Sequence, residues 1–335
     1  MADMDWDAYL SAIRGNDRVA FGGLVASPGD LEFKTTNMTR YASWFSGIGF
    51  TLLQLTAFLR SEWALVLLDR GASMDLHSAC ALGDVDMIKR LLDEDSRAYE
   101  RSIDTYVPAQ FALGHPEALR ALLEHGDNAN RPIHKLAWFD WDDPASERGV
   151  SDWRLVHMVG VGRGKGVETA EVLREFGADL QATASPFGDA AIHLAAIYDR
   201  AELIRWFVEQ GVDVDIPTAD PGLGVAAGDL FEAEPFGPFE GHGKTSLMLA
   251  LGEGQTNAVD ALLDLGADVH AKDSLGHTPM HYAAGAFWKE EAAHVERLIG
   301  CGADLAKLSQ DGQSPLDLAK KKGYQETIAL LERVD

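Results

Sequence analysis

A repeated segment near the C-terminal end of the chain limits its possible folds more than any other feature. Residues 273–304 read DSLGHTPMHYAAGAFWKEEAAHVERLIGCGAD. Thr278 predicts a helix N-cap, and Pro279 is tolerated in the first helical turn, because the N–H that it lacks would have no partner there. A second apolar helix ends near Gly302, a residue that favours the left-handed conformation after a helix. The segment therefore predicts a helix, a turn and a second helix.

The same pattern recurs along the chain at a nearly constant spacing. Thr245 precedes Thr278 by 33 residues, and Ser314 follows it by 36, with the extra residues near 287–291. One helix pair cannot bury its apolar face alone, so successive copies are expected to stack. The T-P-x-H opening, the Gly-Ala-Asp ending and the period of about 33 residues resemble the ankyrin repeat.

This resemblance implies an all-α ankyrin-repeat solenoid, with about eight or nine helix pairs along the chain. In that family the connection between pairs is a finger that projects along the concave side, and the usual work is non-catalytic protein recognition. The expected segments are a degenerate N-terminal cap at 1–50, divergent repeats at 51–130, an insertion at 131–151, repeats at 152–216, a second insertion at 217–243, and near-consensus repeats with a C-terminal cap at 244–335.

The two insertions are rich in aromatic residues, whereas a disordered spacer is poor in them. Long ordered loops in compact proteins usually carry function. Carboxylates beside exposed tryptophans suit a cationic group or a Lys or Arg side chain. The alternative is that the aromatic residues only cover the groove locally. The residues concerned are Trp138, Phe139, Asp140, Trp141, Asp142 and Asp143 in the first insertion, and Phe231, Phe236 and Phe239 in the second.

Seven histidines fall into two groups. His77, His157, His193 and His281 are assigned to equivalent positions of four repeats, where the family's histidine makes hydrogen bonds that tie neighbouring turns together. His134, His242 and His277 lie in or beside the finger loops, and each taken alone predicts a surface histidine. If the insertions converge, His134 and His242 could form an acid/base set with Asp140, Asp142 or Asp143.

Net charge and cysteine content exclude several classes of partner and setting. A formal net charge of −24 argues against nucleic acid and against anionic membrane surfaces. Two distant cysteines, Cys80 and Cys301, form no disulfide framework, which together with an acidic N-terminus predicts a cytoplasmic, reducing setting. The longest apolar run, 51–68, is broken by Arg60, Ser61 and Glu62, so it predicts a helical hairpin and no membrane span.

Two functions follow from these observations. The leading interpretation is a protein that binds a partner through its concave face and finger loops, with Trp138, Phe139, Trp141, Phe231, Phe236, Phe239, His242 and His277 as binding residues. The alternative is an enzyme or a binder of a small, cationic molecule, with a pocket roofed by the two insertions. No metal-ligand spacing occurs, and neither a metal nor another cofactor is expected. The oligomeric state is left open.

Overall fold

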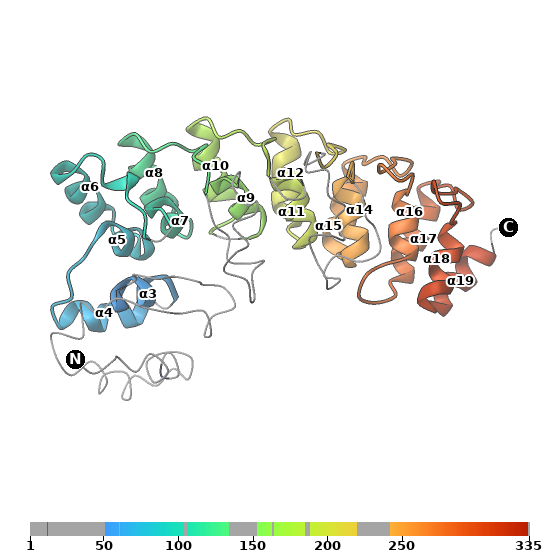
Figure 1. Cartoon of the computed structure of the whole chain (residues 1–335), viewed down its shortest axis with the longest axis horizontal. Helices are drawn as coiled ribbons and strands as arrows, with labels where there is room; N and C mark the ends of the chain where they lie inside the picture. The colour runs from blue at the N-terminus through green and yellow to red at the C-terminus, as the bar shows by residue number, and fades with distance from the viewer. Residues whose placement is uncertain are drawn as a thin grey trace. The chain divides into compact units, whose positions relative to one another are not determined.

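The computed structural model describes residues 12, 51–59, 61–103, 106–133, 153–162, 164–184, 188–219 and 242–333. Contacts within the chain divide it into two compact units. Unit 1 runs up to Leu155 and takes in residues 164–178, and unit 2 consists of 156–162 and 179–333 among the described residues. The helices of both units appear in Figure 1.

Unit 1 consists of helix pairs in which first helices contact first helices and second helices contact second helices. The first helices α3, α5 and α7 form one row, and α6, α8 and α10 form the other. Helices α3 and α4 pack against each other, which confirms the helical hairpin predicted for the longest apolar run. The elements are α3 Leu52–Leu59, α4 Ser61–Asp69, α5 Leu76–Leu82, α6 Val85–Glu94, η2 Ala98–Glu100, α7 Pro108–Ala112, α8 Pro116–Glu124 and α10 Val167–Glu175.

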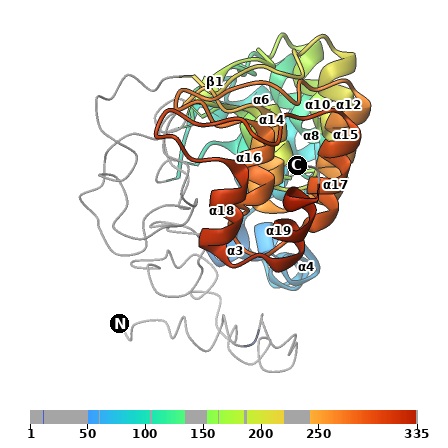
Figure 2. The same cartoon turned by 90° about the vertical axis from the view of Figure 1, so that its right-hand side faces the viewer.

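Unit 2 repeats the same arrangement with helices of similar length. The first helices α11, α14, α16 and α18 follow one another, and α12 contacts α15 as α17 contacts α19. Figure 2 shows the two layers, with α16 and α18 in one and α15 and α17 in the other. The elements are α9 Leu155–Gly160, which begins one residue before this unit, β1 Thr183–Ala184, β2 Asp189–Ala190, α11 Ala191–Ile197, α12 Ala201–Glu209, α14 Ser246–Glu253, α15 Thr256–Asp264, α16 Pro279–Ala284, α17 Ala292–Gly300, α18 Pro315–Lys322 and α19 Gln325–Glu332.

Within the described residues seven helix pairs lie inside one unit each: α3–α4, α5–α6 and α7–α8 in unit 1, and α11–α12, α14–α15, α16–α17 and α18–α19 in unit 2. The predicted stacked helix pairs are therefore present over that part of the chain. None of the helices in the described ranges is long and apolar enough to cross a membrane.

A short motif ends the second helix of six pairs: a large apolar residue followed four positions later by glycine. The N–H after the glycine donates to the carbonyl of the apolar residue, as Ala267 does to Leu262 at 3.0 Å. Gly266 has a φ of 86° and open space where a Cβ would lie, so the backbone angle is what requires glycine there. The six apolar residues are fully buried: Leu67, Leu122, Leu173, Phe207, Leu262 and Leu298.

Helix α16 begins where the sequence predicts. Thr278 is the N-cap of α16, and its N–H donates to Nδ1 of His281 at 3.0 Å. Nε2 of His281 then bonds to the carbonyl of Gln313 in the next finger at 3.2 Å. Because one ring nitrogen accepts and the other donates, this arrangement requires a neutral imidazole.

Of the other three histidines assigned to this position, two occupy it and one does not. His157 bonds to the carbonyl of Ala182 at 2.9 Å and His193 to that of Ile216 at 2.8 Å, which confirms the predicted tie between neighbouring turns. The assignment of His77 to the equivalent position was wrong, because Asp75 caps α5 and puts His77 at the second helical residue instead of the third. Its ring still reaches a carbonyl in the following repeat, at 3.3 Å.

Candidate binding surface at the fingers of unit 2

The finger before α16 is closed by a clasp of three hydrogen bonds between Asp273 and the residues that return to the helix. The N–H of Asp273 donates to the carbonyl of His277 at 3.0 Å, and Oδ1 of Asp273 accepts from the N–H of His277 at 2.8 Å. Gly276 donates to the carbonyl of Asp273 at 3.0 Å. Only Ser274 and Leu275 lie between the two sides of this clasp.

The second insertion is closed by the same clasp. The N–H of Thr218 donates to the carbonyl of Lys244 at 2.8 Å, and Lys244 donates back to Oγ1 of Thr218 at 2.9 Å. Gly243 donates to the carbonyl of Thr218 at 3.0 Å. The short finger at Ser309 and Gln313 has these bonds as well, at 2.9 and 3.1 Å. In the sequence, residues 219–242 therefore take the place of a two-residue finger tip, and they are called the enlarged finger tip below.

The first insertion leaves the repeat at the corresponding place. Ile133 lies seven residues after Gly126, as Asp273 lies seven residues after Gly266. The N–H of Ile133 donates to the carbonyl of Trp153, two residues before α9 begins, at 2.5 Å. Both insertions thus replace the tip of a finger, one based in unit 1 and the other in unit 2.

Successive fingers of unit 2 are bonded to one another. Ser274 donates to the carbonyl of His242 at 2.9 Å, and His242 donates to Oγ of Ser274 at 3.1 Å. One repeat further on, Gln310 donates to the carbonyl of Leu275 at 2.8 Å. Ala219, where the enlarged finger begins, donates to the carbonyl of Gly188 at 2.9 Å. These bonds fix the bases of the fingers in one row.

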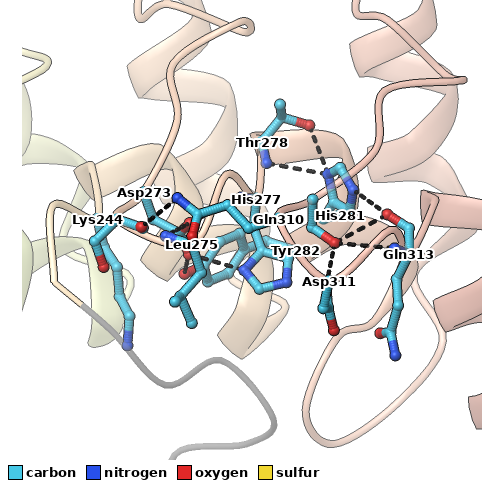
Figure 3. A network of polar contacts seen from close by, with 12 residues as sticks. Lys244, Asp273, Leu275, His277, Thr278, His281, Tyr282, Gln310, Asp311 and Gln313 are labelled. Atoms are coloured by element: carbon cyan, nitrogen blue, oxygen red, sulfur yellow. Dashed lines mark hydrogen bonds and ion pairs between the residues drawn. The ribbon is translucent and has the colours of Figure 1, made fainter.

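His277 lies in a buried network at the base of its finger (Figure 3). Its Nδ1 is 3.1 Å from Oδ2 of Asp273, and the hydroxyl of Tyr282 donates to the same oxygen at 2.9 Å. Burial alone would raise the pKa of Asp273, but the bonds from His277 and Tyr282 together outweigh it and hold that pKa below its ordinary value. The expectation of a surface histidine was therefore wrong for His277, because Asp273 pairs with it inside the repeat.

Ionisable residues precede the N-cap of three first helices of this unit, α11, α14 and α16: they are Asp189, Lys244 and His277. Burial raises the pKa of Asp189 to about 6, although the charge of Lys244 opposes the shift. Burial lowers the pKa of Lys244, opposed by Asp189 and Asp273. The base of the enlarged finger thus combines a partly buried cation with two carboxylates, an arrangement found at binding and catalytic sites and in structural ion pairs alike.

Of the residues predicted to form a site, the structure describes two. His242 is exposed and starts the return from the enlarged finger, and His277 is buried in the adjacent finger. Convergence of the two insertions, and the enzyme alternative that depends on it, stay predictions. No group of side chains in the described part of the chain is arranged to hold a metal ion. Outside the described residues lie His134, Trp138, Phe139, Asp140, Trp141, Asp142, Asp143, Phe231, Phe236 and Phe239.

One surface was not recognised from the sequence. Trp288, in the loop between α16 and α17, has 64% of its surface exposed, and its indole N–H donates to Glu253 at 2.8 Å. The only signal in the sequence was the longer spacing around residues 287–291. That spacing shows an insertion, but it does not show which side chain faces solvent.

The comparisons with known proteins agree with this architecture. A family model for ankyrin repeats in three copies matches residues 158–273 and 247–334, which together exceed half of the chain. The chain belongs to the ankyrin-repeat family. Repeats of this kind imply a role in protein–protein interaction.

Relatives among characterised proteins match only part of the chain. Human protein phosphatase 1 regulatory subunit 27 is 33% identical over 90 residues, which cover 27% of this chain and 56% of that protein. Mouse protein phosphatase 1 regulatory subunit 12A is 36% identical over 89 residues, which cover 26% of this chain and 8% of that protein. The E3 ubiquitin-protein ligase KEG of Arabidopsis thaliana is 28% identical over 122 residues, which cover 36% of this chain and 6% of that protein. The match therefore spans little more than half of these relatives at most.

Proposed function

We propose that this chain binds a protein partner through the fingers of unit 2, with the enlarged finger at 219–242 as the main determinant of specificity. The observation that carries the proposal is the clasp between Thr218 and Lys244. It anchors a 24-residue segment on the same base that holds an ordinary two-residue tip. A segment with fixed ends loses less conformational entropy on binding than a free tail.

The composition of the enlarged finger indicates the chemistry of the partner. Residues 219–242 contain three phenylalanines, five carboxylate residues and neither lysine nor arginine. Buried aromatic side chains supply much of the energy at protein interfaces. Carboxylates around them, in a chain of net charge −24, favour a basic surface on the partner and attract it over a distance.

The clasp suggests a direct experiment. Residues 219–242 can be replaced by Ser-Leu, the two residues that lie between Asp273 and Gly276. Leucine in place of His242 keeps the carbonyl that accepts from Ser274, so the row of fingers is expected to survive. We expect the shortened protein to fold and to lose the partners that the native chain captures in affinity purification with quantitative mass spectrometry. Retention of those partners by a folded, shortened protein contradicts the proposal.

The names of two relatives supply one defined partner to test, the catalytic subunit of protein phosphatase 1. Purified catalytic subunit is titrated against the native chain and against the shortened protein in a calorimetric or interferometric assay. Binding by the native chain alone supports a phosphatase partner held through the enlarged finger. Equal binding by both proteins assigns the contact to another part of the repeats.

A further inference from the structure

The loop between α16 and α17 differs from the other loops that join the two helices of a pair in unit 2. It spans Gly285 to Glu291, seven residues, whereas the loops after α14 and α18 each have two. It lies at the end of these helices that is opposite to the fingers (Figure 1). At its centre is Trp288, with 64% of its surface exposed.

This loop is held from both sides. The N–H of Phe287 donates to the carbonyl of Gly252 at 2.7 Å, and a Cβ on Gly252 would lie 2.8 Å from the ring of Phe287. On the other side the hydroxyl of Tyr324 donates to the carbonyl of Ala286 at 3.0 Å. Glu290 accepts from the N–H of Thr327 at 2.7 Å. Trp288 is therefore presented by a braced backbone, which reduces the entropy lost when a ligand binds it.

Glu253 lies beside the indole without a cation of its own. It accepts the indole N–H of Trp288 at 2.8 Å, and within the described residues no Lys, Arg or His pairs with it. The nearby Lys289 pairs with Glu291 instead. Burial raises the pKa of Glu253, and the bond from Trp288 opposes the rise. The pair thus offers an aromatic ring and a carboxylate that lacks a counter-charge.

We propose that Trp288 and Glu253 bind an arginine side chain of a partner protein. A guanidinium is planar, stacks on an indole face and donates in a fork to a carboxylate, so one residue can use both groups at once. A lysine ammonium is more strongly hydrated and has no plane to stack. This contact uses none of residues 219–242 and does not depend on the function proposed for them.

The test uses the full chain with its tryptophan indole groups labelled with 15N, and Trp288→Phe assigns the relevant signal. The probes are N-acetyl-arginine amide, its neutral counterpart N-acetyl-citrulline amide, and N-acetyl-lysine amide. We expect the arginine derivative to shift the Trp288 indole signal in a saturable way, with little shift from the other two. Equal shifts from the citrulline or lysine derivative overturn the proposal, as does no saturable shift from the arginine derivative.

Glu253→Gln is the decisive variant, because glutamine can still accept the indole N–H but carries no charge. We expect it to weaken binding of the arginine derivative about tenfold, as loss of a hydrogen bond to a charged group does. Glu296→Gln removes one charge from an exposed position of α17 and is the matched control. Equal weakening by the two substitutions shows general attraction to an acidic protein and rejects the site. Replacement of 219–242 by Ser-Leu leaves this binding unchanged, which separates the two proposals.

Discussion

The short finger at 273–277 and the enlarged finger at 218–244 are closed at their bases by the same backbone hydrogen bonds, but the side chains at the two bases make different numbers of bonds. Both use a side-chain oxygen that accepts the N–H of the returning residue. Thr218 contributes one such bond, at 2.9 Å. Asp273 accepts from the N–H groups of Leu275 and His277, from the ring of His277 and from the hydroxyl of Tyr282.

The difference shows how a repeat can gain a long loop without losing its stacking. The short finger supports its own tip through Asp273 and lies over the buried Tyr282 of α16. The enlarged finger has a simpler base, and its neighbours bond to its first and last residues, Ala219 and His242. The tip is therefore the place where length can change, because the bonds of its described residues join the base of the finger to its neighbours.

The largest expected effect comes from Asp273→Ala in the short finger. The substitution removes a buried carboxylate and leaves the N–H of His277 and the hydroxyl of Tyr282 without their acceptor. Breaking a buried, hydrogen-bonded pair in this way costs about 3–5 kcal/mol. Urea unfolding followed by circular dichroism checks the value. A loss below about 1 kcal/mol means that the network does not support the finger.

The next effect concerns the histidine that bonds to the outgoing arm of the enlarged finger. His193 accepts from the N–H of Ala190 at 2.9 Å and donates to the carbonyl of Ile216 at 2.8 Å, so its ring is neutral. Burial, mainly, lowers its pKa from 6.5 to about 4. As the pH falls below 6.5, His193 becomes protonated in the unfolded chain but stays neutral in the native state. Stability present at neutral pH is therefore lost, by about 2 kcal/mol at pH 5.

The variant His193→Gln isolates this effect from an opposing one. Burial raises the pKa of Asp189 to about 6, so that group gains stability as the pH falls and can mask the histidine. Glutamine already occupies the same helical position at Gln110, where it accepts the N–H of Val107 at 2.9 Å. We expect the variant to be about 1 kcal/mol less stable at pH 7, because it loses the bond to Ile216. The gap should close or reverse at pH 5, and a constant gap contradicts the assigned pKa.

The third effect has the opposite sign. Replacing residues 219–242 by Ser-Leu shortens the loop closed by the clasp about fivefold, and loop closure entropy then favours folding by roughly 1.5 kcal/mol. Unfolding of the native and shortened proteins in urea measures the change. A clear loss of stability means instead that the enlarged finger packs on the repeats, and hydrogen exchange at His242 and Ser274 then locates that packing.

The sequence predicts those features of the fingers and their helices that depend on residues close together in the chain. Thr278 and Gly302 predict the ends of α16 and α17, because capping and left-handed glycine depend on neighbouring residues. His77 was misplaced because its segment has no Thr-Pro opening, and Asp75 caps the helix one residue later than the histidine alone suggests. The pair of His277 with Asp273 depends on Tyr282 from the next helix. The clasp joins Thr218 to Lys244 across 25 intervening residues, a distance at which no local pattern exists.

The smallest expected effect is Thr218→Val, which removes one hydroxyl from the clasp and keeps the shape of the side chain. Lys244 then loses the acceptor of its N–H, whereas the bond from Thr218 N–H to the carbonyl of Lys244 remains. A single neutral hydrogen bond contributes about 1 kcal/mol, so the loss should lie near that value, well below that of Asp273→Ala.

The same substitution in the shortened protein is the control, since a two-residue tip holds the two arms together without the hydroxyl. We expect a smaller loss there. Equal losses in both backgrounds mean that the hydroxyl stabilises the base of the finger locally and has no part in closing the long loop.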